Sequence, residues 1–191
     1  MVDVVDLAVE RTDIEGLVVL TMKQVTDGRG TVREFYRESA FVDAGLPSLG
    51  PWVQVNVTET RRGAIRGMHG EAMHKLVAVA SGRGHGAYVD VRRGSATAGR
   101  VVELELLPGM QVLVPPGVCN GFQACSEAMQ YLYCFDHEWR PDMDGVAVSP
   151  LDPALGVSWP EPFDPDDATL VSAKDRGAPT LADVLRVHDG R

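Results

Sequence analysis

The sequence predicts an all-β fold, a sandwich or barrel with a few short peripheral helices. Short apolar runs recur along the chain between Gly, Pro, Asp or Arg residues; they lie at 17–20, 52–57, 75–80, 86–91, 101–107, 111–115 and 129–135. Several of these runs alternate apolar and polar residues with a period of two, as in VQVNV and VELEL, which is typical of half-buried strands. Their spacing leaves no room for helices of about 10–15 residues between neighbouring strands, which disfavours βαβ units.

Two helices, one hairpin turn and one surface loop complete the expected order of elements. The first helix is predicted at 34–45, where Gly45 ends it, and the second at 179–188, where Pro179 suits the first turn. The glycines at 82–86 lie between two strands, so they predict a hairpin turn and not a dinucleotide-binding loop. Residues 161–168, EPFDPDDA, predict an acidic surface loop.

Composition limits the classes of function. The chain of 191 residues predicts one domain spanning 1–191, and its net charge of −9 disfavours nucleic-acid and anionic-membrane binding. No apolar run approaches the roughly 20 residues that cross a bilayer, and the amino-terminal residues do not resemble a signal peptide. Three cysteines without a C-x-x-C motif, Cys119, Cys125 and Cys134, predict a reducing cytoplasm.

The stretch GAIRGMHGEAMHKLVAVASG (63–82) raises the question of a metal site. Its spacing resembles the first block of the cupins, small jelly rolls, and a later block with Gly109, Pro115 and Gly117 resembles the second. Of the four positions that bind metal in cupins, only the first keeps its ligand type; the four hold His69, Glu71, Lys75 and Asn120. A lysine ammonium has no lone pair. His74 adjoins Lys75 in a strand and should face the other way. We therefore expect no metal and no cofactor.

Several further motifs, in order from about residue 24 to 183, resemble those of the nucleotide-sugar 3,5-epimerases that act on dTDP-4-keto-6-deoxyglucose. They are DGRGTVREFY (27–36), VQVNVTETRRGAIRGMH (53–69), KLVAVASG (75–82), YVDVRRGSATAGR (88–100), VPPGVCNGF (114–122), YLYCF (131–135), LDPALGVSWP (151–160) and SAKD (172–175). The resemblance implies a cupin jelly-roll barrel, a homodimer that exchanges an amino-terminal arm of about residues 1–36, and a helical carboxy-terminal tail.

The same resemblance implies roles for individual residues. His69 matches the catalytic base, Asp175 its carboxylate partner, Tyr133 the acid on the opposite face of the sugar, and Lys75 the lysine near the 4-keto oxygen. Substrate contacts are implied for Arg66, Gln54 and Asn56 near the diphosphate and the site wall, and for Asn120, Glu138, Trp139 and Lys174. Arg29 and Glu34 match nucleotide contacts that the partner's arm supplies.

These residue types suit the chemistry. A proton on the carbon beside a ketone can be removed because the charge moves onto the oxygen as an enolate. Histidine titrates near neutral pH, which suits the base. A cation at the oxygen stabilises the developing charge, and a tyrosine hydroxyl can return a proton from the other face.

Departures from the family pattern leave alternatives open. Gly70 and Glu71 stand where Phe-Gln is usual, Asn120 replaces a histidine, and Glu138-Trp139 replaces two aromatics. The identity of the nucleotide base, the identity of the sugar and the carbon that is inverted therefore stay open. Alternative functions are a metal-free cupin 3,4-ketoisomerase and a non-catalytic cupin that binds a nucleotide sugar; a metal-dependent oxygenase is disfavoured by the lost ligands.

Several site residues also have an alternative, structural interpretation. Lys75 would then be an edge-strand lysine that guards against aggregation, and Tyr133 a core residue, with Tyr131 as the alternative acid. Asp90 with Arg92 and Arg93 is interpreted as a hairpin network. The other histidines are predicted to be structural or on the surface; they are His74, His85, His137 and His188.

Overall fold

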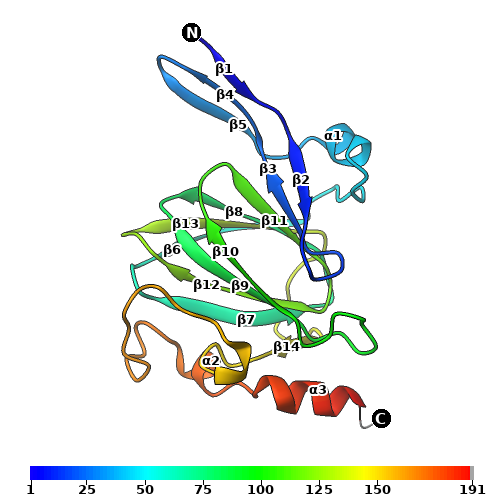
Figure 1. Cartoon of the computed structure of the whole chain (residues 1–191), viewed down its shortest axis with the longest axis vertical. Helices are drawn as coiled ribbons and strands as arrows, with labels where there is room; N and C mark the ends of the chain where they lie inside the picture. The colour runs from blue at the N-terminus through cyan, green and yellow to red at the C-terminus, as the bar shows by residue number, and fades with distance from the viewer. Residues whose placement is uncertain (190–191) are drawn as a thin grey trace.

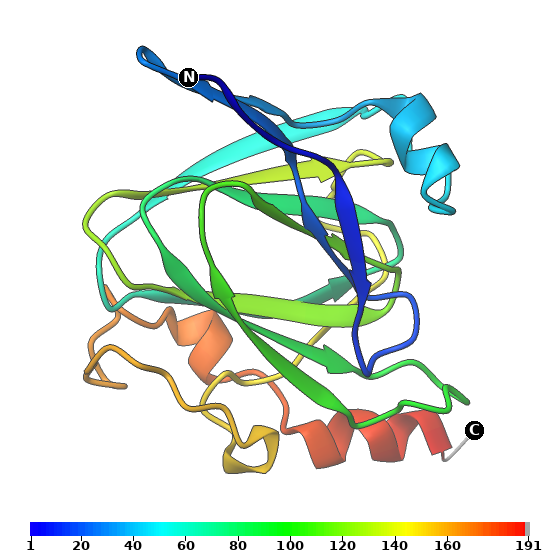
Figure 2. The ribbon, with the colours of Figure 1, turned by 45° about the horizontal axis from the view of Figure 1, so that its top comes forward.

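Two antiparallel sheets face each other and form the body of the protein. The computed structural model describes residues 1–189. The larger sheet has the order β2 (Ala8–Arg11), β3 (Val18–Thr21), β11 (Met110–Val114), β8 (Lys75–Ser81), β13 (Met129–Phe135) and β6 (Gln54–Thr60). The smaller sheet has the order β10 (Val101–Leu106), β9 (Gly84–Asp90), β12 (Val118–Ala124), β7 (Ile65–Glu71) and β14 (Gly145–Ala147). Figures 1 and 2 show the two sheets wrapping around a common interior. The predicted all-β fold of the cupin jelly-roll type, with short peripheral helices, is confirmed.

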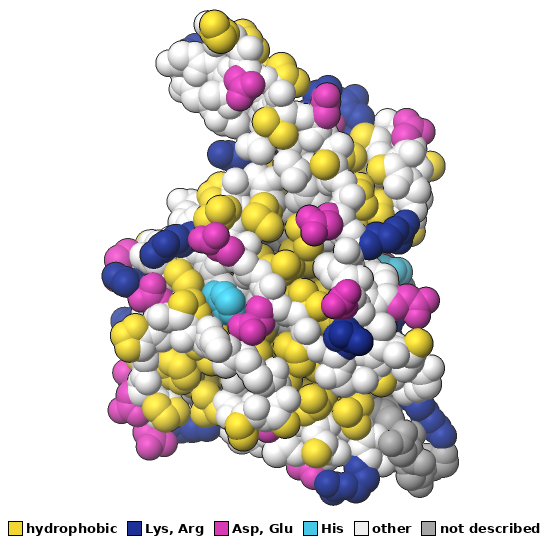
Figure 3. All heavy atoms as spheres, in the orientation of Figure 1, with side chains coloured by type: hydrophobic (Ala, Val, Ile, Leu, Met, Phe, Trp, Pro, Cys, Tyr) yellow, Lys and Arg dark blue, Asp and Glu magenta, His cyan; other side chains and the backbone are white. Residues whose placement is uncertain are grey.

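A third sheet projects away from this body. It has the order β1 (Asp3–Val5), β4 (Lys23–Asp27) and β5 (Gly30–Glu34), and it forms the protruding upper part of the molecule in Figures 1 and 3. Helix α1 (Glu38–Asp43) follows β5, so the helix predicted at 34–45 is shorter than expected. It begins late because β5 pairs with β4 as far as Glu34, opposite Lys23. Val4, Val25 and Val32 are exposed on this sheet.

The interior between the two main sheets is filled by aromatic and aliphatic side chains. Tyr88, Phe122 and Tyr131 are nearly inaccessible there, and the rings of Phe122 and Tyr131 lie 4.4 Å apart. Burial of this kind is the main favourable contribution to folding. Tyr133, which lines the cavity described below, packs against this core.

The glycine-rich link after β8 is not a hairpin. Strands β8 and β9 lie in different sheets, because β8 pairs with β11 and β13 while β9 pairs with β10 and β12. The link therefore crosses from one sheet to the other. Within the link, Gly82 has a φ of +87°, and a Cβ atom there would come within 3.2 Å of Cα of Met129, so a side chain at this position would be strained.

The carboxy-terminal segment lies along the smaller sheet, as Figure 2 shows. It contains a 3₁₀ turn, η1 (Pro153–Leu155), and helices α2 (Ala173–Arg176) and α3 (Leu181–Asp189). Helix α3 starts two residues after Pro179, since the hydroxyl of Thr180 accepts the N–H of Asp183 and so caps the helix. The side chain of His188 is outside the part of the chain that is described. Within residues 1–189, no helix is both long and apolar enough to span a membrane.

Buried hydrogen bonds attach this segment to the barrel. The amide of Gln123 donates to the carbonyl oxygens of Gly63 and Glu161, at 3.1 and 2.9 Å, and its oxygen accepts the N–H of Glu161. Further on, the N–H of Ile65 donates to the carbonyl of Leu170 at 2.8 Å. Glu161 is buried, and its carboxylate accepts a hydrogen bond from Arg62 Nε at 2.7 Å, so the prediction of a surface loop at 161–168 is wrong at its first residue. The segment that follows is thereby placed beside β7.

Candidate active site

A cavity of about 530 Å³ opens beside β7, between β6, β13 and the carboxy-terminal segment. Its polar and aromatic lining comprises Asn56, Thr58, Arg66, His69, Glu71, Tyr133, Phe135, Trp139, Thr169, Ser172, Lys174 and Asp175. A smaller cavity of about 60 Å³ adjoins it and adds Lys75 and Asn120. Most of the residues proposed from the sequence therefore surround one connected space.

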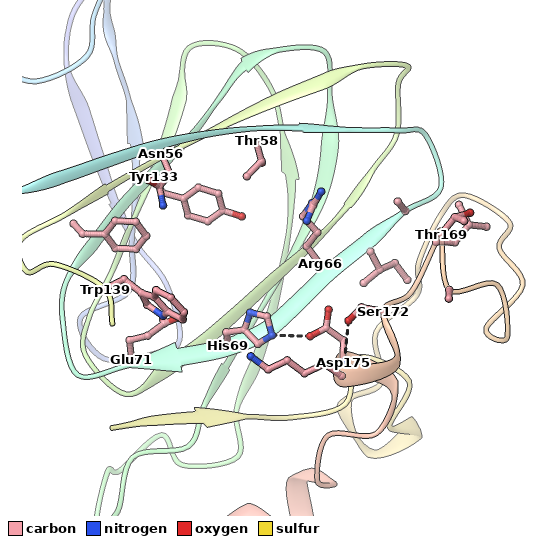
Figure 4. A pocket seen from close by; sticks show the side chains of 16 residues that line it. Asn56, Thr58, Arg66, His69, Glu71, Tyr133, Trp139, Thr169, Ser172 and Asp175 are labelled. Carbon is pink, nitrogen blue, oxygen red and sulfur yellow. Dashed lines mark hydrogen bonds and ion pairs between the residues drawn. The ribbon is translucent and has the colours of Figure 1, made fainter. Parts of the chain in front are cut away.

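His69 and Asp175 form a hydrogen-bonded pair on one wall. His69 Nε2 lies 2.7 Å from Asp175 Oδ1, and the dashed line in Figure 4 marks this contact. The histidine side chain is 38% exposed and the aspartate 8%, so the imidazole faces the cavity and the carboxylate lies behind it. Burial would raise the pKa of Asp175, but hydrogen bonds from His69, from the Ser172 side chain and from the N–H of Gly67 hold it below its ordinary value. The ionised carboxylate can orient the imidazole and stabilise its protonated form.

Tyr133 lies on the wall opposite His69, as Figure 4 shows. It comes from β13 in the larger sheet, and its ring packs edge-on against Tyr131 at 4.9 Å and stacks on Phe135 at 6.0 Å. Burial raises the pKa of Tyr133, so its hydroxyl keeps a proton at neutral pH. Tyr131, the alternative acid, is 1% exposed in the core and does not line the cavity.

Lys75 lies at the floor of the smaller cavity. It begins β8, which has β11 on one side and β13 on the other, so the interpretation as an edge-strand lysine is wrong. Its ammonium donates to Glu71 Oε2 at 2.5 Å and to the backbone oxygen of His69 at 3.0 Å. Glu71 is a site residue that the sequence interpretation missed, although its departure from the family pattern was a visible signal. No group of three or more His, Cys, Asp or Glu side chains within residues 1–189 is arranged to hold a metal ion.

The remaining substrate-contact candidates are divided between the cavity and its surroundings. Arg66, Asn56 and Lys174 line it, and the Nε of Arg66 donates to the hydroxyl of Thr60 at 3.0 Å. Trp139 also lines it, held by a hydrogen bond from its backbone N–H to Gln54 Oε1 at 2.8 Å.

Gln54 therefore supports the wall without lining the larger cavity, and Glu138 faces a neighbouring hollow beside His137 and Arg140. Asn120 lies opposite His69 on β12. Arg29 and Glu34 lie on the projecting sheet and do not line the cavity of their own chain; they are paired with Asp27 and Arg37.

Three of the other histidines have acidic partners outside the cavity. His74 and His137 both contact Asp136, at 2.9 and 3.0 Å, and His85 contacts Glu103 at 2.7 Å.

The network around Asp90 has the predicted structural character. The carboxylate accepts hydrogen bonds from the Arg92 guanidinium at 2.9 and 2.8 Å, from the Ser95 hydroxyl at 2.6 Å and from the Thr97 hydroxyl at 2.5 Å. These contacts fix the loop between β9 and β10.

Comparisons with known proteins all find sugar epimerases. The family model described as dTDP-4-dehydrorhamnose 3,5-epimerase matches residues 11–183. A dTDP-4-dehydrorhamnose 3,5-epimerase from Pseudomonas aeruginosa is 34% identical over 179 residues, covering 91% of this chain and 95% of that protein. A dTDP-4-dehydro-6-deoxyglucose 3-epimerase from Streptomyces bikiniensis is 33% identical over 170 residues, covering 85% and 83%.

Solved structures agree with the sequence relatives. The crystal structure of NovW, a 4-keto-6-deoxy sugar epimerase from Streptomyces spheroides, superimposes with a TM-score of 0.86 at 28% identity, covering 96% of this chain and 92% of that one. ChmJ, a 3′-monoepimerase from Streptomyces bikiniensis, superimposes with a TM-score of 0.83 at 32% identity, covering 92% and 89%. Family model, sequence relatives and structures all cover most of the chain, which therefore belongs to the dTDP-4-dehydrorhamnose 3,5-epimerase family.

Proposed function

We propose that the protein inverts carbon 3, carbon 5 or both in a dTDP-linked 4-keto-6-deoxyhexose, by removing a proton on one face of the sugar and returning one on the other. The observation that carries this proposal is the pairing of His69 with Asp175 on one wall, opposite the hydroxyl of Tyr133 on the other. Relatives named as 3,5-epimerases and as 3-epimerases both match the chain, so an experiment has to decide which carbon is inverted.

In the proposed mechanism His69 acts as the base. Its Nε2 lies against Asp175, so Nδ1 is the ring nitrogen left for the substrate carbon, and this nitrogen is unprotonated when Nε2 donates to the carboxylate. The carboxylate then stabilises the imidazolium that forms. A positioned base of this kind contributes roughly 10²–10⁴-fold to the rate.

The charge that leaves carbon appears on the ketone oxygen. Lys75 is the cation proposed to stabilise it from the floor of the smaller cavity, which adjoins His69 and Tyr133. One such donor is worth roughly 10²–10³-fold in kcat. Tyr133 then protonates the enolate carbon from the opposite wall, since a tyrosine hydroxyl carries its proton at neutral pH. No step in this scheme requires a metal ion.

The nucleotide end of the substrate is proposed to contact Arg66, Lys174 or Trp139, all of which line the cavity. Guanidinium and ammonium groups suit a diphosphate, and an indole offers a face on which a base can stack. Two related structures contain bound dTDP-sugars: an RmlC from Streptococcus suis with dTDP-D-xylose and ChmJ with dTDP-quinovose. They support a sugar nucleotide as the ligand of this site.

We also infer a homodimer in which the projecting sheet of one chain completes the nucleotide site of the other. Strand β6 is an edge of the larger sheet. It exposes Val55 and Val57, at 54% and 60%, and Val53, directly before it, is 48% exposed. An edge strand with a row of exposed valines is a surface that a second chain can cover. Arg29 and Glu34 lie on the projecting sheet, where the proposed exchange would bring them to the partner's cavity.

The test is incubation with dTDP-4-keto-6-deoxyglucose in deuterium oxide, with deuterium counted at carbons 3 and 5 by NMR. The proposal expects deuterium at one or both carbons together with inversion there. A carbonyl moved to carbon 3 would instead identify a 3,4-ketoisomerase. Tight binding without any exchange would identify a nucleotide-sugar-binding cupin.

A further inference from the structure

The contact between Glu71 and Lys75 joins the two main sheets at the floor of the site. Glu71 lies two residues after His69 in β7, so the two side chains project from the same face of the smaller sheet. Lys75 begins β8 in the larger sheet. Their side chains are 15% and 3% exposed, and both line the smaller cavity.

A buried ammonium needs a partner. Removing an ion from water is very costly unless an opposite charge and hydrogen bonds compensate it. The carboxylate of Glu71, at 2.5 Å, supplies the opposite charge, and the backbone oxygen of His69, at 3.0 Å, supplies a second acceptor. The cation is therefore retained in a place where water has little access.

These two acceptors also orient the ammonium. A lysine ammonium has three N–H donors. Glu71 and the His69 carbonyl take two of them, and within residues 1–189 the ammonium donates to no third acceptor. With two donors fixed, the direction of the third follows from the tetrahedral geometry of the nitrogen.

On this geometry, and building on the function proposed above, we propose that Glu71 is a positioning residue: it holds the Lys75 ammonium so that its third N–H is presented to the ketone oxygen of the substrate. Because one of the two anchors is the backbone of His69, the cation is fixed relative to the base as well. The negative charge of Glu71 does not cancel the effect of Lys75, because the donor N–H contacts the oxygen directly and Coulomb energy falls with distance.

Substitution of Glu71 by leucine tests this role, since leucine has a similar size and offers no hydrogen-bond acceptor. Glutamine is unsuitable, because it is the usual residue of the family at this position and its amide oxygen can still accept from Lys75. Glu71→Leu should slow deuterium exchange into dTDP-4-keto-6-deoxyglucose at saturation by about 10²-fold, the cost of a misplaced catalytic group, with KM changed less than about threefold. Glu71→Asp keeps the charge but shortens the reach, and should slow exchange by about tenfold. Glu103→Leu, which removes a carboxylate from the His85 pair away from the cavity, is the matched control and should leave exchange unchanged.

A second measurement does not depend on activity. The lysines of the chain are Lys23, Lys75 and Lys174, and of these Lys75 is buried. In protein labelled with ¹⁵N at lysine Nζ, the Lys75 ammonium should give a protected, slowly exchanging proton signal, with exposed Lys23 and Lys174 as internal references. Glu71→Leu should remove that protection, whereas Glu103→Leu should keep it.

The outcomes separate the two proposals. Wild-type protein that exchanges no deuterium refutes the proposed function. Wild-type exchange together with a Glu71→Leu variant that exchanges at the same rate, or that keeps the protected Lys75 signal, overturns the role of Glu71 alone. Should Glu71→Leu fail to fold, Glu71→Asp decides: a rate equal to wild type overturns the role, and slowed exchange in a folded variant supports it.

Discussion

Replacement of Tyr133 by phenylalanine separates the two halves of the proposed reaction. The change deletes one hydroxyl and keeps the ring, which packs at 4.9 Å against Tyr131 and at 6.0 Å against Phe135. Because the hydroxyl faces the cavity and not the core, the fold should change little. We expect the folded variant to remove a proton through His69 and to lack the acid on the opposite wall.

The expected magnitudes differ for the two observables. Loss of the acid should slow inversion by about 10²–10⁴-fold, which corresponds to about 2.7–5.4 kcal/mol of transition-state stabilisation. Exchange of the substrate proton with deuterium should continue, because the base can return a deuteron to the face from which it took the proton. The variant should therefore accumulate labelled substrate of unchanged configuration.

The assay follows exchange and inversion together by NMR in deuterium oxide. Tyr131→Phe is the matched control, since Tyr131 is 1% exposed and does not line the cavity. His69→Asn should lose both exchange and inversion. If Tyr133→Phe inverts the sugar as fast as wild type, the acid is another group, and the assignment of opposite walls to base and acid is refuted.

Three further predictions concern the rest of the molecule. Dialysis against a chelator should leave activity unchanged, and loss of activity that a divalent ion restores would contradict this. Deletion of residues 1–36 should give a monomer by light scattering with weakened substrate affinity; an active monomer would show that the projecting sheet serves only its own chain. Asp90→Asn should destabilise the protein by about 3 kcal/mol in urea unfolding at pH 7, because a buried carboxylate loses its charge-assisted hydrogen bonds. Burial raises the pKa of Asp90, but the hydrogen bonds from Arg92, Ser95 and Thr97 hold it below its ordinary value. The stability that the carboxylate contributes is therefore present above about pH 4 and is lost as the pH falls below it. The difference in unfolding free energy between Asp90→Asn and wild type should accordingly shrink in acid.

The strands that alternate apolar and polar residues could be predicted from the sequence, and two that line the site could not. The runs at 101–107 and 129–135 became β10 and β13 almost residue for residue. Strands β7 and β12 carry glycines and polar residues at alternate positions where a half-buried strand would have apolar residues. All seven residues of β12 are buried, Asn120 and Gln123 among them, because their polar groups face the site or the carboxy-terminal segment. No pattern of hydrophobicity signals a strand of this kind.

The site itself depends on contacts between residues distant in sequence. His69 and Asp175 are 106 positions apart, and only the resemblance to a family suggested that they meet. The hydrogen bonds between Gln123 and Glu161, which help to bring Asp175 beside β7, have no local sequence signal. The bond from Glu71 to Lys75 spans four positions, but it crosses from one sheet to the other, so helical or strand spacing does not predict it.

The two-sheet architecture explains why this fold suits inversion at carbon. A planar enolate must be approached from both faces, and a single sheet presents its side chains to one side of a ligand only. Here the base position, His69, belongs to β7 of the smaller sheet, and the acid position, Tyr133, belongs to β13 of the larger one. Lys75 extends from the larger sheet to the backbone oxygen of His69 in the smaller, so the ion-paired floor fixes the separation of the two walls. A substitution that loosens this floor should therefore impair abstraction and return of the proton together, whereas loss of the Tyr133 hydroxyl should impair the return alone.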